Sequence, residues 1–311
     1  MHNGFEKVFM GAAGTSGSSF DPSKAIAVGH DSSPFVSVYS WDVDDGFGGK
    51  FSNPSTLPGG SCLGVRFSFD GSAIAVAHYN SPYVTAYPWS GSGFGTKFSN
   101  PSTLPANTAL GVSFNPDGSD IIVGHIGSPY VTAYPWSGSG FGTKYSNPST
   151  LPTNFPFGVS FSPDGSAVAV GHVSGGNITA YPWSGSGFGT KYSDPSTTPT
   201  GHGDVRFSPD GSAIAVGHAN NPYVTAYPWS GSGFGTKFSN PSTLPSDTAN
   251  GVAFSTDGSA LAVSHGRGFG AYYITVYPWS GSGFGTKYAN PSTAVPNTAH
   301  DVAFSIVGDP Q

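Results

Sequence analysis

The chain carries an aspartate, a serine and a histidine at the same spacing in several similar segments, for example Asp210, Ser212 and His218. These residue types form the proton relay of serine hydrolases. Here the aspartate precedes a predicted strand and the histidine ends it, so about six residues at ~3.3 Å each hold the two side chains roughly 20 Å apart. An active site is normally a unique constellation, whereas this pattern is repeated, and we therefore predict a structural role and no enzyme.

Two further histidines, His202 and His300, stand outside this pattern, and each has an aspartate close by, Asp204 and Asp301. Both histidines lie in loops before predicted strands. A metal ion needs three or four ligands, and one such pair does not supply them. We expect hydrogen-bonded pairs at the surface, and neither a metal site nor a cofactor.

The first pattern belongs to a unit of 46 to 50 residues that occurs six times in the 311-residue chain. A period of this length is typical of a ring or stack, because each unit leaves an apolar face that its neighbour covers. One domain over residues 21–311 is therefore expected. Every tryptophan of the chain belongs to one of the units, namely Trp41, Trp89, Trp136, Trp183, Trp229 and Trp279.

Four strands are predicted in each unit, and no helical period occurs. The first, such as Gly111–Phe114, leads into an Asp-Gly turn, and the second, such as Ala213–His218, is apolar. The third, such as Tyr83–Trp89, alternates in polarity, and the fourth, such as Thr96–Phe98, follows a glycine-rich loop. Four antiparallel strands in each of six units predict an all-β fold, a six-bladed β-propeller with four-stranded blades.

Two blocks, FSPDGSAVAVGH at 161–172 and YPWS at 181–184, resemble the WD-repeat pattern, which implies the propeller fold. The Trp-Asp pair itself occurs only at Trp41-Asp42, so the buried hydrogen-bond network of that family is not assumed. The near-identical PYVTAYPWSGSGFGTK blocks are similar to repetitive propellers of tailed bacteriophages. That resemblance implies a non-enzymatic binding or assembly module, in the virion or the host cytoplasm, with virion subunits or another protein as partner.

The two ends of the chain suggest how the ring closes. Asp301–Ser305 repeats the first strand of a unit, and we expect it to join the N-terminal blade at residues 24–56; a seven-bladed or incomplete ring is the alternative. Residues 1–20 would then be an arm, in which Gly4–Phe9 resembles a fourth strand. An unpaired strand of this kind recruits a sheet edge, either on its own propeller or in a homo-oligomer.

Differences among the six copies point to a candidate contact loop. The loops before the first strand and after the second vary, and both lie at one end of the blades, while the other loops barely change. The longest variable loop carries Arg267, Phe269, Tyr272 and Tyr273, a composition enriched in binding hot spots. The alternative is a lectin-like propeller with one weak glycan site per blade, in which sugars stack on Trp89, Trp136, Trp183, Trp229 and Trp279.

Charge and composition exclude some partners. The net charge is −6 with no basic stripe, so nucleic acid is not expected. Cys62 is the only cysteine, which rules out an intrachain disulfide. No run approaches the roughly 18 apolar residues of a membrane helix, and we predict a soluble protein.

Overall fold

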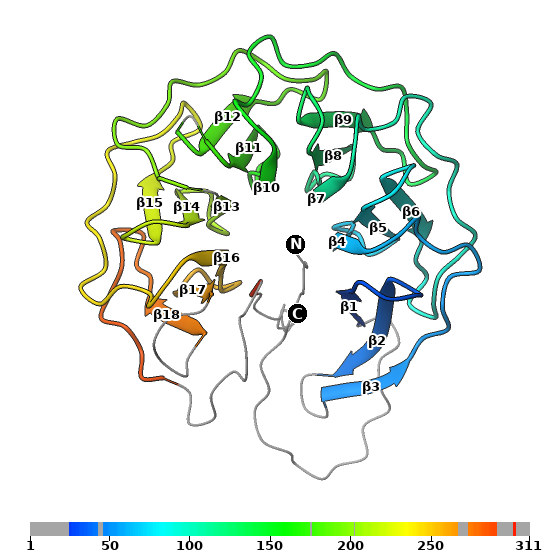
Figure 1. Cartoon of the computed structure of the whole chain (residues 1–311), viewed down its shortest axis with the longest axis horizontal. Helices are drawn as coiled ribbons and strands as arrows, with labels where there is room; N and C mark the ends of the chain where they lie inside the picture. The colour runs from blue at the N-terminus through cyan, green and yellow to red at the C-terminus, as the bar shows by residue number, and fades with distance from the viewer. Residues whose placement is uncertain are drawn as a thin grey trace.

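The computed structural model of the chain describes residues 25–42, 46–174, 176–201, 203–266, 273–290 and 301–302. Every regular element in these ranges is a β-strand, in six antiparallel sheets of three strands that lie around a common centre (Figure 1). This arrangement confirms the all-β propeller architecture. A search of the same ranges finds no helix that could span a membrane.

The strands follow the repeat along the chain. Their bounds are β1 (Ala25–Gly29), β2 (Val36–Asp42), β3 (Gly46–Lys50), β4 (Cys62–Phe67), β5 (Ala73–His78), β6 (Val84–Pro88), β7 (Ala109–Phe114), β8 (Asp120–His125), β9 (Val131–Pro135), β10 (Pro156–Phe161), β11 (Ala167–His172), β12 (Ile178–Pro182), β13 (Gly203–Phe207), β14 (Ala213–His218), β15 (Val224–Pro228), β16 (Ala249–Phe254), β17 (Ala260–His265) and β18 (Ile274–Pro278). From the second sheet on, each sheet holds the first, second and third strands of its unit. The first strand of each, from β4 to β16, lies nearest the centre (Figure 1).

The prediction of four regular strands per blade is corrected. In the second unit, the expected fourth strand is joined to β6 by a bridge between Trp89 and Phe94 and by two backbone hydrogen bonds. Gly95 N–H donates to the Pro88 carbonyl at 2.8 Å, and Phe98 N–H donates to the Ala86 carbonyl at 2.9 Å. Between these two bonds the fourth strand advances three residues, from Gly95 to Phe98, while β6 advances two, from Pro88 to Ala86, and this mismatch is a β-bulge. Pro88 has no N–H group, so it cannot donate a further hydrogen bond to the fourth strand.

The turn between the first and second strands forms as its sequence predicts. Gly71 has φ +67°, a conformation that glycine adopts without strain. The Asp70 carboxylate accepts hydrogen bonds from the Ser72 N–H at 3.0 Å and the Ser68 hydroxyl at 2.6 Å. The turn therefore holds its aspartate at the end of the blade opposite to the histidine.

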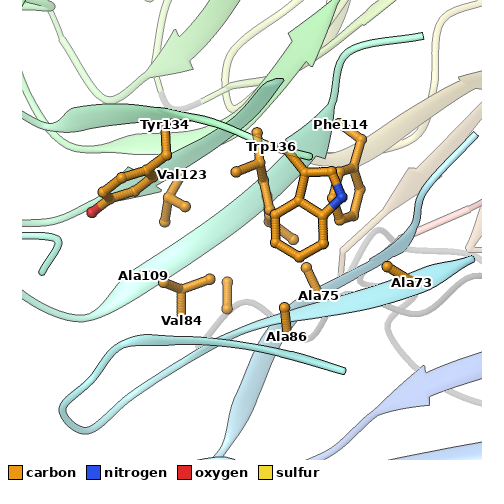
Figure 2. Packing of buried hydrophobic residues seen from close by; sticks show 12 residues of the cluster. Ala73, Ala75, Val84, Ala86, Ala109, Phe114, Val123, Tyr134 and Trp136 are labelled. Atoms are coloured by element: carbon orange, nitrogen blue, oxygen red, sulfur yellow. The ribbon is translucent and has the colours of Figure 1, made fainter. Parts of the chain in front are cut away.

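The hydrophobic core lies between blades. One face of the sheet β4–β6 presents small side chains, and the next sheet fills the space beside them with larger ones (Figure 2). No single blade could bury these residues alone, because each cluster draws residues from two neighbouring blades. The cluster between the second and third sheets contains Ala73, Ala75, Ala77, Val84 and Ala86 on one side and Ala109, Val112, Phe114, Ile121, Val123, Tyr134 and Trp136 on the other.

Tryptophan completes each of these cores. The Trp136 ring lies edge-on to Phe98 of the preceding unit, with centroids 5.3 Å apart, and to Phe114 and Phe141 of its own unit at 5.2 and 5.3 Å. Tyr134 extends the link, since its hydroxyl donates to the Thr103 carbonyl of the preceding unit at 2.8 Å. Equivalent contacts recur in the described units, so aromatic side chains join each blade to the one before it.

From the second unit on, a histidine ends the second strand and is buried there. His78 and His125 share hydrogen bonds through Nε2 with the hydroxyls of Thr85 and Thr132, at 2.9 and 2.8 Å. Burial away from water lowers the pKa of each of these histidines to about 4. They are therefore neutral parts of the core at physiological pH.

The C-terminal segment is described only at residues 301–302, which lie at the inner edge of the ring beside β16 (Figure 1). Val302 packs with Ala253, Ala262 and Ile274 of the last sheet. The rest of the predicted closing strand and the N-terminal arm at residues 1–20 lie outside the described residues.

We expect Trp136→Ala to lower the free energy of unfolding by about 3–5 kcal/mol, because it removes a buried ring that joins two blades. Chemical denaturation followed by circular dichroism measures the change. Phe69→Ala is the control, since Phe69 is 71% exposed and its loss should matter by less than about 0.5 kcal/mol. Equal effects of the two substitutions would contradict the packing role of Trp136.

Stability should fall in mild acid because of the buried histidines. In the unfolded chain a histidine binds its proton near pH 6.5, whereas folded His78 and His125 resist protonation down to about 4. The unfolded state therefore takes up more protons, and the contribution of these groups is complete above pH 6.5 and is lost between about 6.5 and 4. Urea midpoints across this range test the prediction, and His125→Gln should flatten the dependence.

Candidate functional site

The repeated Asp, Ser and His residues do not meet. Asp210 lies in its turn and accepts hydrogen bonds from the hydroxyls of Ser208 and Ser212 at 2.6 and 2.7 Å. The first of these bonds is the main cause of the lowered pKa of Asp210. His218 lies at the other end of β14, where its Nε2 shares a hydrogen bond with Thr225 at 2.9 Å. The structural role predicted for this pattern is confirmed.

The predicted contact loop falls mostly outside the described residues. Arg267, Phe269 and Tyr272 are among the residues without a description. Tyr273 is described, and its carbonyl accepts a hydrogen bond from the His265 N–H at 2.9 Å. A binding role for the four residues stays a prediction.

The five tryptophans considered for glycan stacking are Trp89, Trp136, Trp183, Trp229 and Trp279, and their exposed fractions lie between 4% and 6%. Each ring is enclosed by aromatic side chains of its own and the preceding unit. Stacking requires an open ring face, and these rings present none to a sugar.

A polar cluster that the repeat does not duplicate lies where the inner strands meet. The inner strands β4, β7, β10 and β13 and residue 301 surround a cavity of about 20 Å³ at the centre of the ring. At one position of the first strand, four units have glycine, as in Gly158, whereas two have Asp204 and Asp301. Two residues further along, two of the units have Arg66 and Arg206. All four charged residues line the cavity.

The expectation for Asp204 and Asp301 is therefore wrong. They were expected in surface pairs with His202 and His300, which both lie outside the described residues. Asp204 is instead the second residue of β13 and only 2% exposed. The strand β13 begins at Gly203, directly after His202, so Asp204 belongs to the strand and not to the loop. Its side chain lines the central cavity, which we call the channel.

Asp204 forms a compensated ion pair. Arg206 Nη1 donates to Asp204 Oδ1 at 2.7 Å and also to the Val205 carbonyl at 2.8 Å. The Val252 N–H of the neighbouring β16 donates to Asp204 Oδ2 at 3.2 Å. A buried carboxylate is costly without such partners, so this set of hydrogen bonds fixes both the charge and the position of Asp204.

Asp301 stands in a different environment. Burial raises its pKa to about 7, and the negative charge of Asp204 adds to this effect. The positive charges of Arg206 and Arg66 oppose it without cancelling it. A carboxyl group with a pKa near neutrality exchanges its proton readily at physiological pH, as general acids and bases require.

One comparison within the sequence would have found this cluster. The six first strands are alike in their apolar positions, and the aspartates and arginines are the exceptions to an otherwise glycine, serine or alanine pattern. Attention to residues shared by all units hides these exceptions. In a repeat protein, a functional centre is better sought where single units depart from the common pattern.

Comparison with known proteins gives a fold and no family. No protein-family model and no curated protein matches the chain. Among similar solved structures, one from Bacteroides fragilis described as a "putative 6-phosphogluconolactonase" has 14% identity and a TM-score of 0.65, with 89% of this chain and 82% of that chain covered. A Bacteroides uniformis structure described in the same words has 14% identity and a TM-score of 0.63, covering 88% and 81%. Hydrazine synthase of Kuenenia stuttgartiensis has 16% identity and a TM-score of 0.60, covering 84% and 75%.

These neighbours overturn the expectation of a non-enzymatic bacteriophage binding or assembly module. Three structures with this fold carry the names of enzymes. The prediction of no enzyme is therefore corrected. The repeat builds the ring and leaves individual inner positions free to differ, as at Asp204 and Asp301. The lectin-like alternative is not retained either.

The raised pKa of Asp301 predicts a pH dependence that Asp301→Asn removes. The folded protein keeps this proton up to about pH 7, whereas the unfolded chain releases it near 3.8. The folded state therefore binds more protons in this window, and wild type should lose stability relative to Asp301→Asn as the pH rises from about 3.8 to about 7. Urea midpoints of the two proteins at about pH 5 and about pH 8 measure the difference. A constant difference would contradict the raised pKa.

Proposed function

We propose that this propeller is a hydrolase whose catalytic centre is the channel cluster of Asp204, Arg206, Asp301 and Arg66. The observation that carries the proposal is the meeting of two carboxyl groups and two guanidinium groups at the cavity where the inner strands converge. Burial raises the pKa of Asp301 toward neutrality, and such a shifted carboxyl group beside other charges is typical of functional sites. The repeat does not require them, since other units have glycine and serine at the same positions.

Asp301 acts as the general base in this proposal. A cavity of about 20 Å³ has room for about one water molecule beside it. Ionised Asp301 takes a proton from the water as its oxygen attacks a carbonyl carbon of the substrate. The ester C–O bond then breaks, and the proton passes from Asp301 to the departing alkoxide oxygen, which leaves the enzyme as it began.

The two arginines have different roles. Arg206 is held by Asp204 and the Val205 carbonyl, so it keeps the Asp204 charge in place beside Asp301. Arg66 Nη1 donates to the Val65 carbonyl at 2.9 Å, and Arg66 lines the same cavity as Asp301. We assign Arg66 to an anionic group of the substrate, which a guanidinium binds through paired hydrogen bonds.

A phosphorylated sugar lactone fits these requirements. It combines an activated carbonyl with a phosphate group, and two of the structural neighbours are described as lactonases of this kind. A sugar ring is much larger than the cavity, so the substrate lies at the channel mouth with its carbonyl toward Asp301. At 14% identity these neighbours support the choice of substrate for a first assay and no more.

Ring closure and partners complete the proposal. We keep the six-bladed ring closed by 301–305 as a proposal, together with the seven-bladed or incomplete alternative. Val302 packs on the last sheet as a first strand packs on the preceding blade. This packing fits both the closed six-bladed ring and the alternative. The arm at residues 1–20 is proposed to pair with a sheet edge in a homo-oligomer, and the Arg267 to Tyr273 loop to contact a protein partner.

The test is hydrolysis of 6-phosphogluconolactone measured by proton release. Asp301→Asn should lower kcat by about 10²- to 10⁴-fold, because the general base is lost. Arg66→Gln should raise KM by about tenfold or more, because a charged hydrogen bond to the phosphate is lost. Asp117→Asn is the matched control, since Asp117 serves only a turn, where it accepts hydrogen bonds from Ser119.

Two outcomes would overturn the proposal. One is a wild-type protein without activity on this lactone and on its unphosphorylated counterpart. The other is full activity of folded Asp301→Asn. If Arg66→Gln has the same KM as wild type for the phosphorylated lactone and for the unphosphorylated one, only the role given to Arg66 is removed.

A further inference from the structure

The two channel carboxyl groups lie against glycines of the preceding inner strands. A methyl carbon on Gly158 of β10 would lie 2.1 Å from Asp204 Oδ1 and 3.1 Å from the Val205 nitrogen. A methyl carbon on Gly251 of β16 would lie 2.6 Å from Asp301 Oδ1 and 3.0 Å from its Cα. Carbon does not approach oxygen this closely, so each carboxyl group occupies space that exists only because the facing residue has no side chain.

The same position in β7 is less constrained. A methyl carbon on Gly111 of β7 would lie 3.6 Å from Val159 Cγ2, which is an ordinary van der Waals contact. No carboxyl group is among its nearest atoms. Gly111 therefore offers a matched control, because it has the same place in the repeat and lacks only the acidic neighbour.

Backbone conformation does not explain the requirement for glycine. None of Gly111, Gly158 and Gly251 is among the residues with positive φ. Alanine can adopt the backbone conformation of all three positions, so a substitution acts through the space that its methyl group takes.

We propose that Gly158 and Gly251 are positioning residues that seat the carboxyl groups of Asp204 and Asp301 in the channel. Each glycine makes a notch for the acidic residue of the following inner strand. The notch keeps Asp204 within reach of Arg206 and the Val252 N–H, and it keeps Asp301 beside both arginines. The catalytic consequence rests on the proposed function, whereas the placement of the carboxyl groups does not.

Displacement of Asp204 should change the pKa of Asp301. Asp204 is one cause of the raised pKa of Asp301, and it also engages Arg206, which opposes that rise. A methyl group at Gly158 displaces the Asp204 carboxylate from its place beside β10 and so changes its distance from both Asp301 and Arg206. The pKa of Asp301 should then shift by about one unit, the usual size of an effect from one nearby charge.

The experiment is a ¹³C NMR titration of protein labelled at aspartate carboxyl carbons, with the Asp301 signal assigned through Asp301→Asn. Gly158→Ala should shift the pKa of Asp301 by about one unit, and Gly111→Ala should leave it unchanged. Gly251→Ala should shift it as well, because the methyl group displaces the Asp301 carboxyl group itself. A wild-type titration of Asp301 in folded Gly158→Ala and Gly251→Ala would overturn the proposal.

A double-mutant cycle covers the case in which Gly158→Ala folds poorly. Asp204→Gly restores the residue that most units have at this position and removes the oxygen that the new methyl group meets. The loss in urea midpoint caused by Gly158→Ala should therefore be much smaller in the Asp204→Gly background. Equal losses in both backgrounds would overturn the notch. Neither measurement depends on activity, so absence of lactonase activity alone would reject the proposed function and leave this inference standing.

Discussion

The burial of each blade against its neighbour is the constraint on which the rest of the structure depends. A blade presents alanine-rich surface on one face and large aromatic side chains on the other, and the two surfaces fit only across the boundary between units. Trp136 shows this clearly, because its ring packs on Phe98 of the preceding unit as well as on its own Phe114. Stability is therefore a property of neighbouring pairs, which explains why these residues hardly change from unit to unit.

The same packing brings the inner strands together at the centre. Glycine at one position lets adjacent first strands approach closely, as at Gly64, where a methyl carbon would lie 3.0 Å from the Leu110 carbonyl oxygen. The charged side chains at this position and two residues further along the inner edge line the central cavity and do not belong to the hydrophobic clusters between blades, so units differ here while the cores stay the same. Asp204, Asp301, Arg66 and Arg206 occupy this edge, and a repetitive scaffold thereby carries a cluster that occurs once.

Much of the fold could be predicted from the repeat, and much of the candidate site could not. The first three strands, the Asp-Gly turns and the packing role of tryptophan follow from local patterns that recur from the second unit on. The fourth strand was predicted too regularly, because Pro88 and the bulge before Phe98 break its pairing with β6. The site was missed because Asp204 and Asp301 were interpreted through their sequence neighbours His202 and His300, whereas the strand that begins at Gly203 carries Asp204 into the channel.

The sequence by itself determined the all-β class, the number of repeat units, the buried faces of the second and third strands, and the positions at which units differ. These properties depend on residue type and on periods of a few residues. Only the tertiary structure decided that Asp204, Asp301, Arg66 and Arg206 share one cavity. They come from units far apart in the chain, and their meeting depends on how the blades converge on a common centre, a global geometry that no local pattern encodes.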